Sequence, residues 1–152
     1  MVDIKENQKL NVNNVLSYRE KMKHSEMDNI VKNMESKIQE LGDLRVGSPI
    51  TATYGIEGDV IDVEILLPAD RYIDSTGDYV FKNRIQIVNA VVAIFKGHPV
   101  GLQEACNRLN QYIKGHGLQL ITVGYNVTKN IDMLKPENTE IDEYVGISPN
   151  IL

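Results

Sequence analysis

The residues with the clearest chemical potential lie in the stretch GHPVGLQEACNRLNQYIKGHG, residues 97 to 117. This stretch holds the single cysteine of the chain, Cys106, and two of its three histidines, His98 and His116. A cysteine paired with a histidine could act as a nucleophile, and the same residue types could bind a metal ion. Whether these residues form a catalytic site, a metal site or only part of the protein core depends on the secondary structure that carries them.

The spacing of apolar residues indicates an amphipathic helix that ends near Gly117. Cys106 falls on the buried stripe of this helix, where a free cysteine behaves as a small apolar residue. His98 and His116 lie at opposite ends of the helix, which at about 1.5 Å per residue is too long for both to bind one ion. We therefore predict a core cysteine, exposed histidines (His24 included), no catalytic residue, no metal site and no cofactor.

The same pattern occurs twice in the chain. Met27, Ile30, Val31, Met34 and Ile38 each have an apolar counterpart at one constant spacing, in Leu102, Ala105, Cys106, Leu109 and Ile113. Each helical pattern follows a strand-like run (14–22 and 89–97) and precedes two more (49–56 with 60–68, and 118–128 with 140–149). The sequence thus predicts one α+β domain, 1–152, built from two β-α-β-β repeats, 11–68 and 85–149, joined by 69–84.

Five residues on the predicted strands are candidates for ligand binding. Tyr54 and Tyr125 occupy equivalent strands, where two rings could flank one cleft, although the reading we favour is that they pack on a sheet face. Glu64 stands in an apolar strand and could be a partly buried carboxylate with a raised pKa, but strand alternation favours a solvent-facing position shared with Asp62. Tyr18 in the first strand and Glu143 in the last are further candidates.

Composition excludes several classes of protein. The net charge of −5, without a long run of either sign, predicts neither nucleic-acid nor membrane binding. A single cysteine rules out an internal disulfide framework, and no signal-peptide core or membrane-length apolar run is present. No Gly-rich phosphate loop or serine-histidine-carboxylate pattern occurs either, so we expect a cytoplasmic protein that is not an enzyme.

The order of elements over residues 11 to 149, with AVVAIFKGHPVGLQEACNRLNQYIKGHGLQL and VIDVEILLP as its anchors, resembles the GyrI-like effector-binding domain. That domain is also the ligand-sensing part of multidrug-responsive transcription activators. The segments ENQKLNVNNVLSYREKMKHSEMDNIVKNM and FKNRIQIVNAVVAIFKGH look more closely like an uncharacterised bacterial family of stand-alone proteins, often encoded beside LXG-type secreted toxins.

The resemblance implies a pseudo-twofold arrangement, with a curved antiparallel sheet, both helices on one face and a ligand cleft between the repeats. In ligand-responsive members a glutamate in a Glu-x-Tyr pattern faces cationic aromatic ligands or acts in hydrolysis. The matching stretch here is Tyr125-Asn126-Val127, and its lack of an acidic residue counts against both activities.

Three functional hypotheses follow from the residues and the resemblance. The first is a non-catalytic binding module whose cleft takes a neutral planar aromatic molecule, because two ring faces would hardly offset the lost hydration of a cation. An inward-facing Glu64 would reverse this preference by supplying a counter-charge. The second is a protein-interaction partner, accessory or neutralising, in a bacterial toxin system. A hydrolase ranks third.

Overall fold

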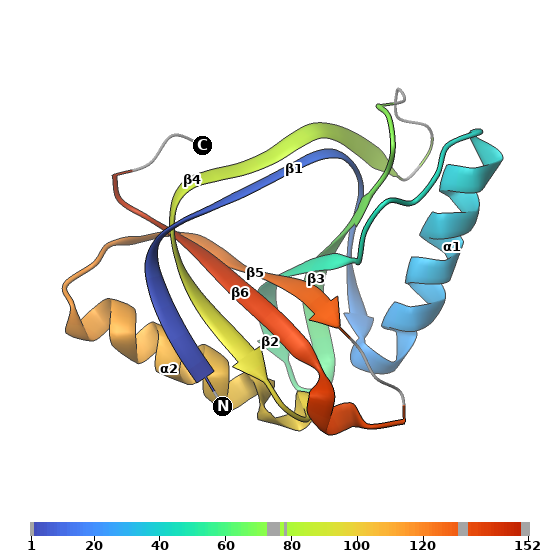
Figure 1. The fold of residues 1–152 in the computed structure, drawn as a ribbon. Helices are drawn as coiled ribbons and strands as arrows, with labels where there is room; N and C mark the ends of the chain where they lie inside the picture. The colour runs from blue at the N-terminus through green and yellow to red at the C-terminus, as the bar shows by residue number, and fades with distance from the viewer. Residues whose placement is uncertain (1, 73–76, 78, 131–133, 150–152) are drawn as a thin grey trace. The chain divides into compact units, whose positions relative to one another are not determined.

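The computed structural model describes residues 2–72, 77, 79–130 and 134–149. Within these residues the chain forms six strands and two α-helices, which confirms the α+β class (Figure 1). The elements are, in order, β1 (Val2–Lys23), α1 (Met27–Glu40), β2 (Ile50–Glu57), β3 (Val60–Pro68), β4 (Val80–Lys96), α2 (Leu102–Gly115), β5 (Leu120–Asn130) and β6 (Glu140–Ile147). Neither helix of the described part is long and apolar enough to span a membrane.

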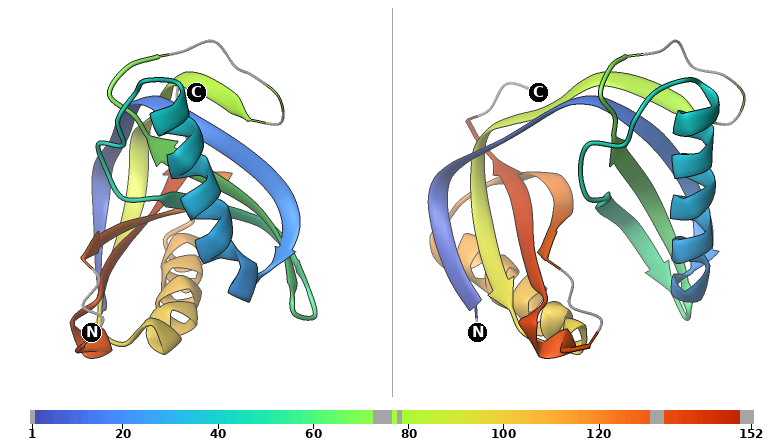
Figure 2. Two further views of the ribbon diagram at one scale, coloured as in Figure 1. Left: turned by 90° about the vertical axis from the view of Figure 1, so that its right-hand side faces the viewer. Right: turned by 45° about the vertical axis from the view of Figure 1, so that its right-hand side comes forward.

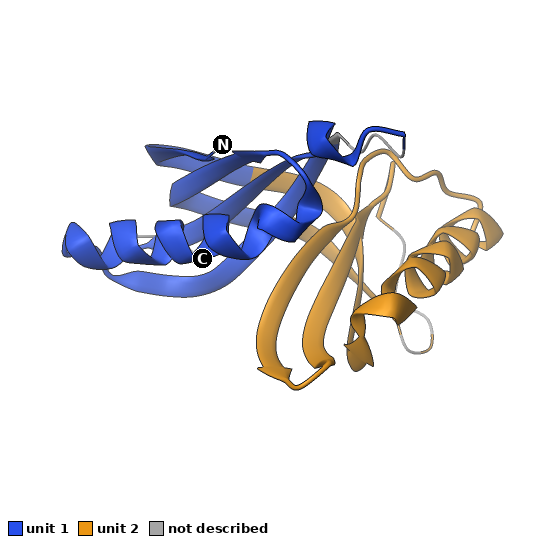
Figure 3. Cartoon of the chain, turned by 90° about the horizontal axis from the view of Figure 1, so that it is seen from below, with its two compact units in different colours: residues 1–10, 86–152 blue, residues 11–85 orange. Residues whose placement is uncertain are grey.

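The chain divides into two compact units, shown in different colours in Figure 3. Unit 1 comprises residues 1–10 and 86–152, and unit 2 comprises residues 11–85. The long strands β1 and β4 each contribute one part to each unit. Residues 1–10, which the sequence analysis left outside both repeats, therefore belong to the unit that contains α2.

In unit 2, β3 lies between β1 and β2 and pairs antiparallel with both. Figure 2 shows α1 lying along one face of these strands, and the apolar residues of the helix pack on them. Met34 and Ile38 are fully buried there, while Met27, Ile30 and Val31 are half-buried at the edge of the same core. The strands supply the rest of this core through Leu16, Met22, Val63, Ile65, Leu67, Ala69 and Phe81.

Unit 1 repeats this plan with β6 between β4 and β5. Leu109 and Ile113 of α2 pack against Val91, Ala93 and Val145 of the strands. Met34 and Leu109, which we predicted to be equivalent core residues, both have an exposed fraction of 0%. The predicted stripes are therefore confirmed at their buried positions, Met34 and Ile38 in α1 and Ala105, Leu109 and Ile113 in α2, whereas their remaining residues are half-buried.

The lengths of two strands differ from the prediction. β1 begins at Val2 rather than near residue 14, and β4 begins at Val80 rather than at residue 89, inside the segment interpreted as a connection. In these added parts the buried and half-buried apolar residues, such as Val2, Ile4 and Leu10 of β1, are separated by exposed polar residues, so the alternation is too interrupted to mark a continuous strand. Asn7 and Asn14 also have positive φ angles of 59° and 56°, which interrupt the regular alternation of β1.

Candidate functional site

Glu64 lies in the middle of β3, the central strand of unit 2. Its register partners are Arg19 on β1 and Ala52 on β2. Val63 and Ile65 turn toward α1, so Glu64 points to the opposite face of the strands. That face is covered as well, and Glu64 is only 5% exposed. The prediction that Glu64 faces solvent is therefore wrong, because β3 is buried on both faces from Val63 to Pro68.

Three side chains donate hydrogen bonds to the Glu64 carboxylate, and with it they form what we call the Glu64 cluster. Lys82 Nζ donates to Oε2 at 2.6 Å, Ser17 Oγ donates to the same oxygen, and the Tyr54 hydroxyl donates to Oε1 at 3.1 Å. Burial raises the pKa of Glu64, but the hydrogen bonds from Lys82, Ser17 and Tyr54 outweigh burial and hold the pKa below its ordinary value. Glu64 is therefore an ionised, buried carboxylate, and the raised pKa considered from the sequence is not found.

Tyr54 connects this cluster to a second ion pair on the same face. The Arg19 guanidinium lies over the Tyr54 ring, 3.7 Å from its centroid. Arg19 also binds Asp62 through two contacts, Nε to Oδ1 at 3.1 Å and Nη2 to Oδ2 at 3.0 Å. The hydrogen bond from Arg19 is the main cause that lowers the pKa of Asp62. Each carboxylate beside Tyr54 thus has its own cationic partner.

The local structure of β2 turns Tyr54 toward Glu64. The β2–β3 pairing shifts register between Thr53 and Gly55, so Tyr54 occupies an irregularity in the strand. Tyr54 is 38% exposed although its hydroxyl reaches the buried carboxylate. Tyr54 therefore combines a hydroxyl group fixed at Glu64 with a residue surface that remains partly open to solvent.

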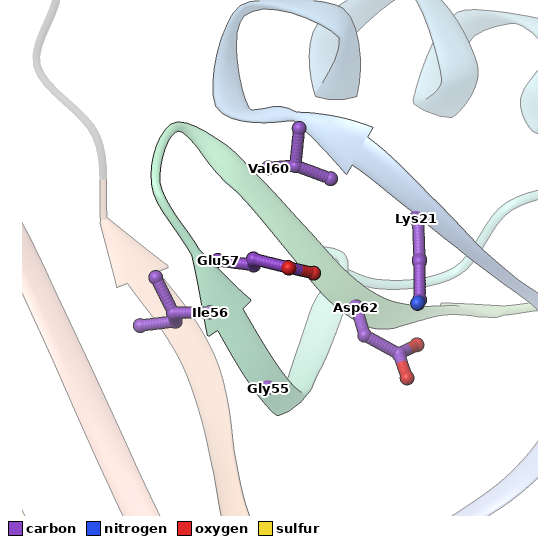
Figure 4. Close-up of a pocket in the computed structure, with 6 residues that line it drawn as sticks. All are labelled: Lys21, Gly55, Ile56, Glu57, Val60 and Asp62. Atoms are coloured by element: carbon purple, nitrogen blue, oxygen red, sulfur yellow. The ribbon is translucent and has the colours of Figure 1, made fainter.

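A hollow of about 280 Å³ lies next to Asp62, near the turn between β2 and β3, and we call it the hairpin hollow. In Figure 4 the side chain of Lys21 points toward Asp62, its register partner on β3. Its lining is formed by Lys21, Gly55, Ile56, Glu57, Val60 and Asp62. The hollow lies next to the Arg19–Tyr54 contact. Asp62 lines the hollow and also pairs with Arg19, and Gly55, which lines it too, directly follows Tyr54.

Tyr18, the other candidate of unit 2, does not join the Glu64 cluster. Its ring packs against the α1 core and lies 5.4 Å from the ring centroid of Tyr79, and its hydroxyl donates to Glu20 at 2.6 Å. Its chain neighbour Ser17 faces Glu64 instead, because successive residues of a strand point to opposite faces.

Tyr125 and Glu143 both lie in unit 1, on opposite faces of its strands. Glu143 is 7% exposed and lies beneath α2, where Cys106 Sγ donates a hydrogen bond to its Oε2. Tyr125 pairs in register with Tyr144, the residue after Glu143, and is half-buried. Alternation separates the two candidates, so they do not form one site within unit 1.

Burial is the main cause that raises the pKa of Glu143, and the hydrogen bond from Cys106 opposes it. Burial and the contact with Glu143 raise the pKa of Cys106 to about 12. Cys106 is half-buried, so the predicted core position is confirmed only in part. A thiol with such a pKa is protonated at neutral pH and is a poor nucleophile.

The histidines have local structural contacts. His98 accepts a hydrogen bond from the backbone N–H of Val100 at the start of α2, and His116 stacks on Tyr112 with a 3.9 Å centroid separation. All three histidines are exposed, as predicted. The described part of the chain contains no group of three or more His, Cys, Asp or Glu residues arranged for a metal ion.

Sequence reasoning missed four members of the site. Strand alternation together with the β1–β3 register would have placed Arg19, Asp62 and Ser17 on the same face as Glu64, but the sequence does not give this register. No feature of the sequence indicated that Lys82 belongs to the site, because the segment that contains it was interpreted as a connection and not as a strand.

No protein-family model and no curated protein sequence matches the chain. Solved structures do, and the crystal structure of the EcmrR C-terminal domain is 16% identical with a TM-score of 0.78, covering 97% of this chain and 97% of that domain. The chain shares the fold of the EcmrR C-terminal domain. EcmrR in the cryo-EM structure of an EcmrR–DNA complex is 17% identical to this chain, with a TM-score of 0.78. The match covers 97% of this chain but only 57% of the longer EcmrR chain.

Two further structures share the fold at lower similarity. A hydrolase from Listeria innocua is 11% identical with a TM-score of 0.59, and the match covers 97% of this chain and 91% of that protein. SAV2435 bound to tetraphenylphosphonium is 8% identical with a TM-score of 0.55, covering 98% and 94% respectively. At identities this low these similarities establish a shared fold and nothing more.

Proposed function

We propose that this protein is a non-catalytic binding module for a neutral aromatic small molecule. The ligand binds to the face of unit 2 that carries Tyr54, Arg19 and the hairpin hollow. The observation that carries this proposal is the pairing of charges around Tyr54, since Lys82 neutralises Glu64 and Arg19 neutralises Asp62. A neutral ring that packs beside Tyr54 and the 68% exposed Ile56 would bury apolar surface without separating these pairs.

The similarity to SAV2435, which is bound to tetraphenylphosphonium, supports small-molecule binding by this fold. Our proposal differs in the charge of the ligand. A permanent cation gains little here, because the two carboxylates nearest Tyr54 already have cationic partners. The proposed site lies within unit 2 and does not depend on Tyr125.

The test is a thermal-shift and calorimetric comparison of neutral aromatic compounds with their cationic analogues on the wild type, Tyr54→Ala and Tyr72→Ala. Tyr72 is a matched control, because it is 43% exposed and belongs to the same unit but not to the Glu64 cluster. We expect neutral compounds to stabilise the wild type and Tyr72→Ala, with the effect lost in Tyr54→Ala. Equal stabilisation of all three proteins would contradict the proposed site.

The absence of catalysis is part of the proposal. Ser17 donates its proton to a carboxylate, Glu64 is held ionised by Lys82, and the Cys106 thiol is protonated at neutral pH. None of these groups has the arrangement of an activated nucleophile. Ester substrates should therefore be hydrolysed no faster by the wild type than by Glu64→Gln, and a loss of hydrolysis in that variant would identify an enzyme.

A second candidate is a role as a protein-interaction partner, including an accessory or neutralising partner in a secreted-toxin system. It is favoured by Leu44 and Val46, which are 65% and 57% exposed in the segment after α1. Affinity capture from the native host with the wild type and a Leu44→Asp, Val46→Asp variant tests it. A partner retained equally by both proteins would rule out this surface.

A further inference from the structure

Lys82 differs from the other donors to Glu64 in how it is held. Ser17 is 5% exposed and is fixed by the β1–β3 register, in which it pairs with Leu66. The side chain of Lys82 is 43% exposed and reaches the carboxylate through a long flexible stem that begins on β4. The ammonium group is therefore the partner that can leave without a change in the strands.

The position of Lys82 Nζ shows which chemistry the carboxylate accepts. Glu64 Oε2 receives a charged N–H donor at 2.6 Å, and Ser17 and Tyr54 leave this approach open. A primary ammonium on a ligand would present the same charge and the same donors. Lys82 and such a ligand would compete for one position.

We propose that Lys82 determines the specificity of the Glu64 cluster by occupying, with its own ammonium group, the position that the cationic group of a ligand would take. This inference rests on the proposed function, because it assigns the charge of the ligand at the same face. A side chain of the same chain competes at an effective concentration in the millimolar range or above, so a free ammonium ligand binds only to the fraction of molecules in which Lys82 has left. Removal of the lysine charge should convert a site for neutral molecules into a site for cations.

The experiment measures the binding of 2-phenylethylammonium and of the neutral 2-phenylethanol by calorimetry at about pH 7, where the ammonium is charged. Lys82→Met removes the charge and keeps a long side chain, and Lys82→Arg keeps the charge as the matched control. We expect the ammonium to bind Lys82→Met at least about tenfold more tightly than the wild type, with no gain for Lys82→Arg. The gain should disappear in the Lys82→Met, Glu64→Gln double variant.

Equal ammonium affinity of the wild type and folded Lys82→Met would overturn the proposal, and so would a gain that persists in the double variant. Circular dichroism establishes folding, and Lys82→Gln replaces Lys82→Met if the methionine variant does not fold. The neutral alcohol separates this inference from the proposed function. If no neutral aromatic compound binds the wild type while the ammonium binds Lys82→Met, the proposed function fails and the role of Lys82 stands.

Discussion

Replacement of Glu64 by glutamine should destabilise the protein at neutral pH. The carboxylate accepts hydrogen bonds from Ser17, Tyr54 and Lys82, and a hydrogen bond to a charged group typically contributes about 1.5–3 kcal/mol. A glutamine keeps one oxygen as acceptor but places an amide group where the other oxygen was. The contribution of Lys82 is discounted because its side chain is 43% exposed. We expect a loss of about 2 kcal/mol in the free energy of unfolding.

The pH dependence of this loss has a definite sign. The pKa of Glu64 is lower in the folded protein than its ordinary value, so its contribution to stability is present above the unfolded pKa and is lost as the pH falls through the folded pKa. The difference between the wild type and Glu64→Gln should therefore be largest near neutral pH and shrink below about pH 4.

Urea unfolding followed by circular dichroism measures these free energies, because the chain contains no tryptophan for fluorescence. Glu40→Gln, at an exposed position of α1, is the control for removal of one glutamate charge and should not show the loss of stability of Glu64→Gln at neutral pH. If Glu64→Gln unfolds within about 0.5 kcal/mol of the wild type at neutral pH, the carboxylate is not the acceptor of three hydrogen bonds and the reasoning fails.

Three further predictions concern unit 1. A thiol reagent should label Cys106 in the folded protein at least about a hundredfold more slowly than in urea, because a thiol with a pKa of about 12 forms almost no thiolate. Equal labelling rates in the folded and unfolded protein would contradict this pKa. Glu143→Gln should gain stability over the wild type as the pH rises above the ordinary pKa of glutamate, because a raised folded pKa means that the wild type loses stability on deprotonation. Glu137→Gln, at an exposed position, is the control, and unfolding free energies of Glu143→Gln and the wild type that change in parallel with pH would refute the prediction. Gly124→Ala should lower the free energy of unfolding in urea by about 1–3 kcal/mol, because its Cβ would lie 2.9 Å from Glu143 Oε1. Gly115→Ala, with open space around its Cβ, is the control and should cost nothing. Equal stabilities of the two variants would show that Glu143 does not fill the space beside Gly124.

The contact of Cys106 with Glu143 determines how well a valine would be tolerated at this position. A core cysteine surrounded by apolar atoms would tolerate valine within about 1 kcal/mol, because the two side chains have similar volumes. Valine would also remove the S–H donor of a carboxyl group that is 7% exposed. The cost of Cys106→Val should therefore exceed the volume effect and reach about 1–2 kcal/mol, whereas Cys106→Ser keeps a donor.

The sequence predicted the helices well, since a 3.6-residue period needs only the chain itself to be recognised. The stripes of Met34 and Leu109 lie in their cores as expected. The hairpin of β2 and β3 was also predicted nearly to the residue, because Gly58 with a φ of 65° marks its turn. These features depend on local periodicity and turn chemistry.

The candidate site depends on contacts between distant strands, which periodicity does not encode. A prediction from strand alternation assumes that one face of the strand is exposed to solvent, and it therefore assigned Glu64 and Asp62 to the solvent face. In β3, residues of both faces are buried, and the lysine that neutralises Glu64 comes from β4. A buried charge requires a partner, but the sequence does not say which of the 16 lysines and arginines supplies it.

The two buried glutamates show how the partner, more than burial, sets the chemistry of a carboxyl group. Glu64 and Glu143 are 5% and 7% exposed, and burial is the largest influence on both pKa values. An ammonium group and two hydroxyl groups reverse that influence at Glu64, whereas a thiol, a weak donor, cannot reverse it at Glu143. Glu64 is thus a carboxylate whose negative charge is held by its partners, whereas burial raises the pKa of Glu143 above its ordinary value. We therefore place the proposed binding site at Glu64 and the strands of unit 2, because a fixed charge can select ligands by charge, whereas Glu143 is enclosed beneath α2.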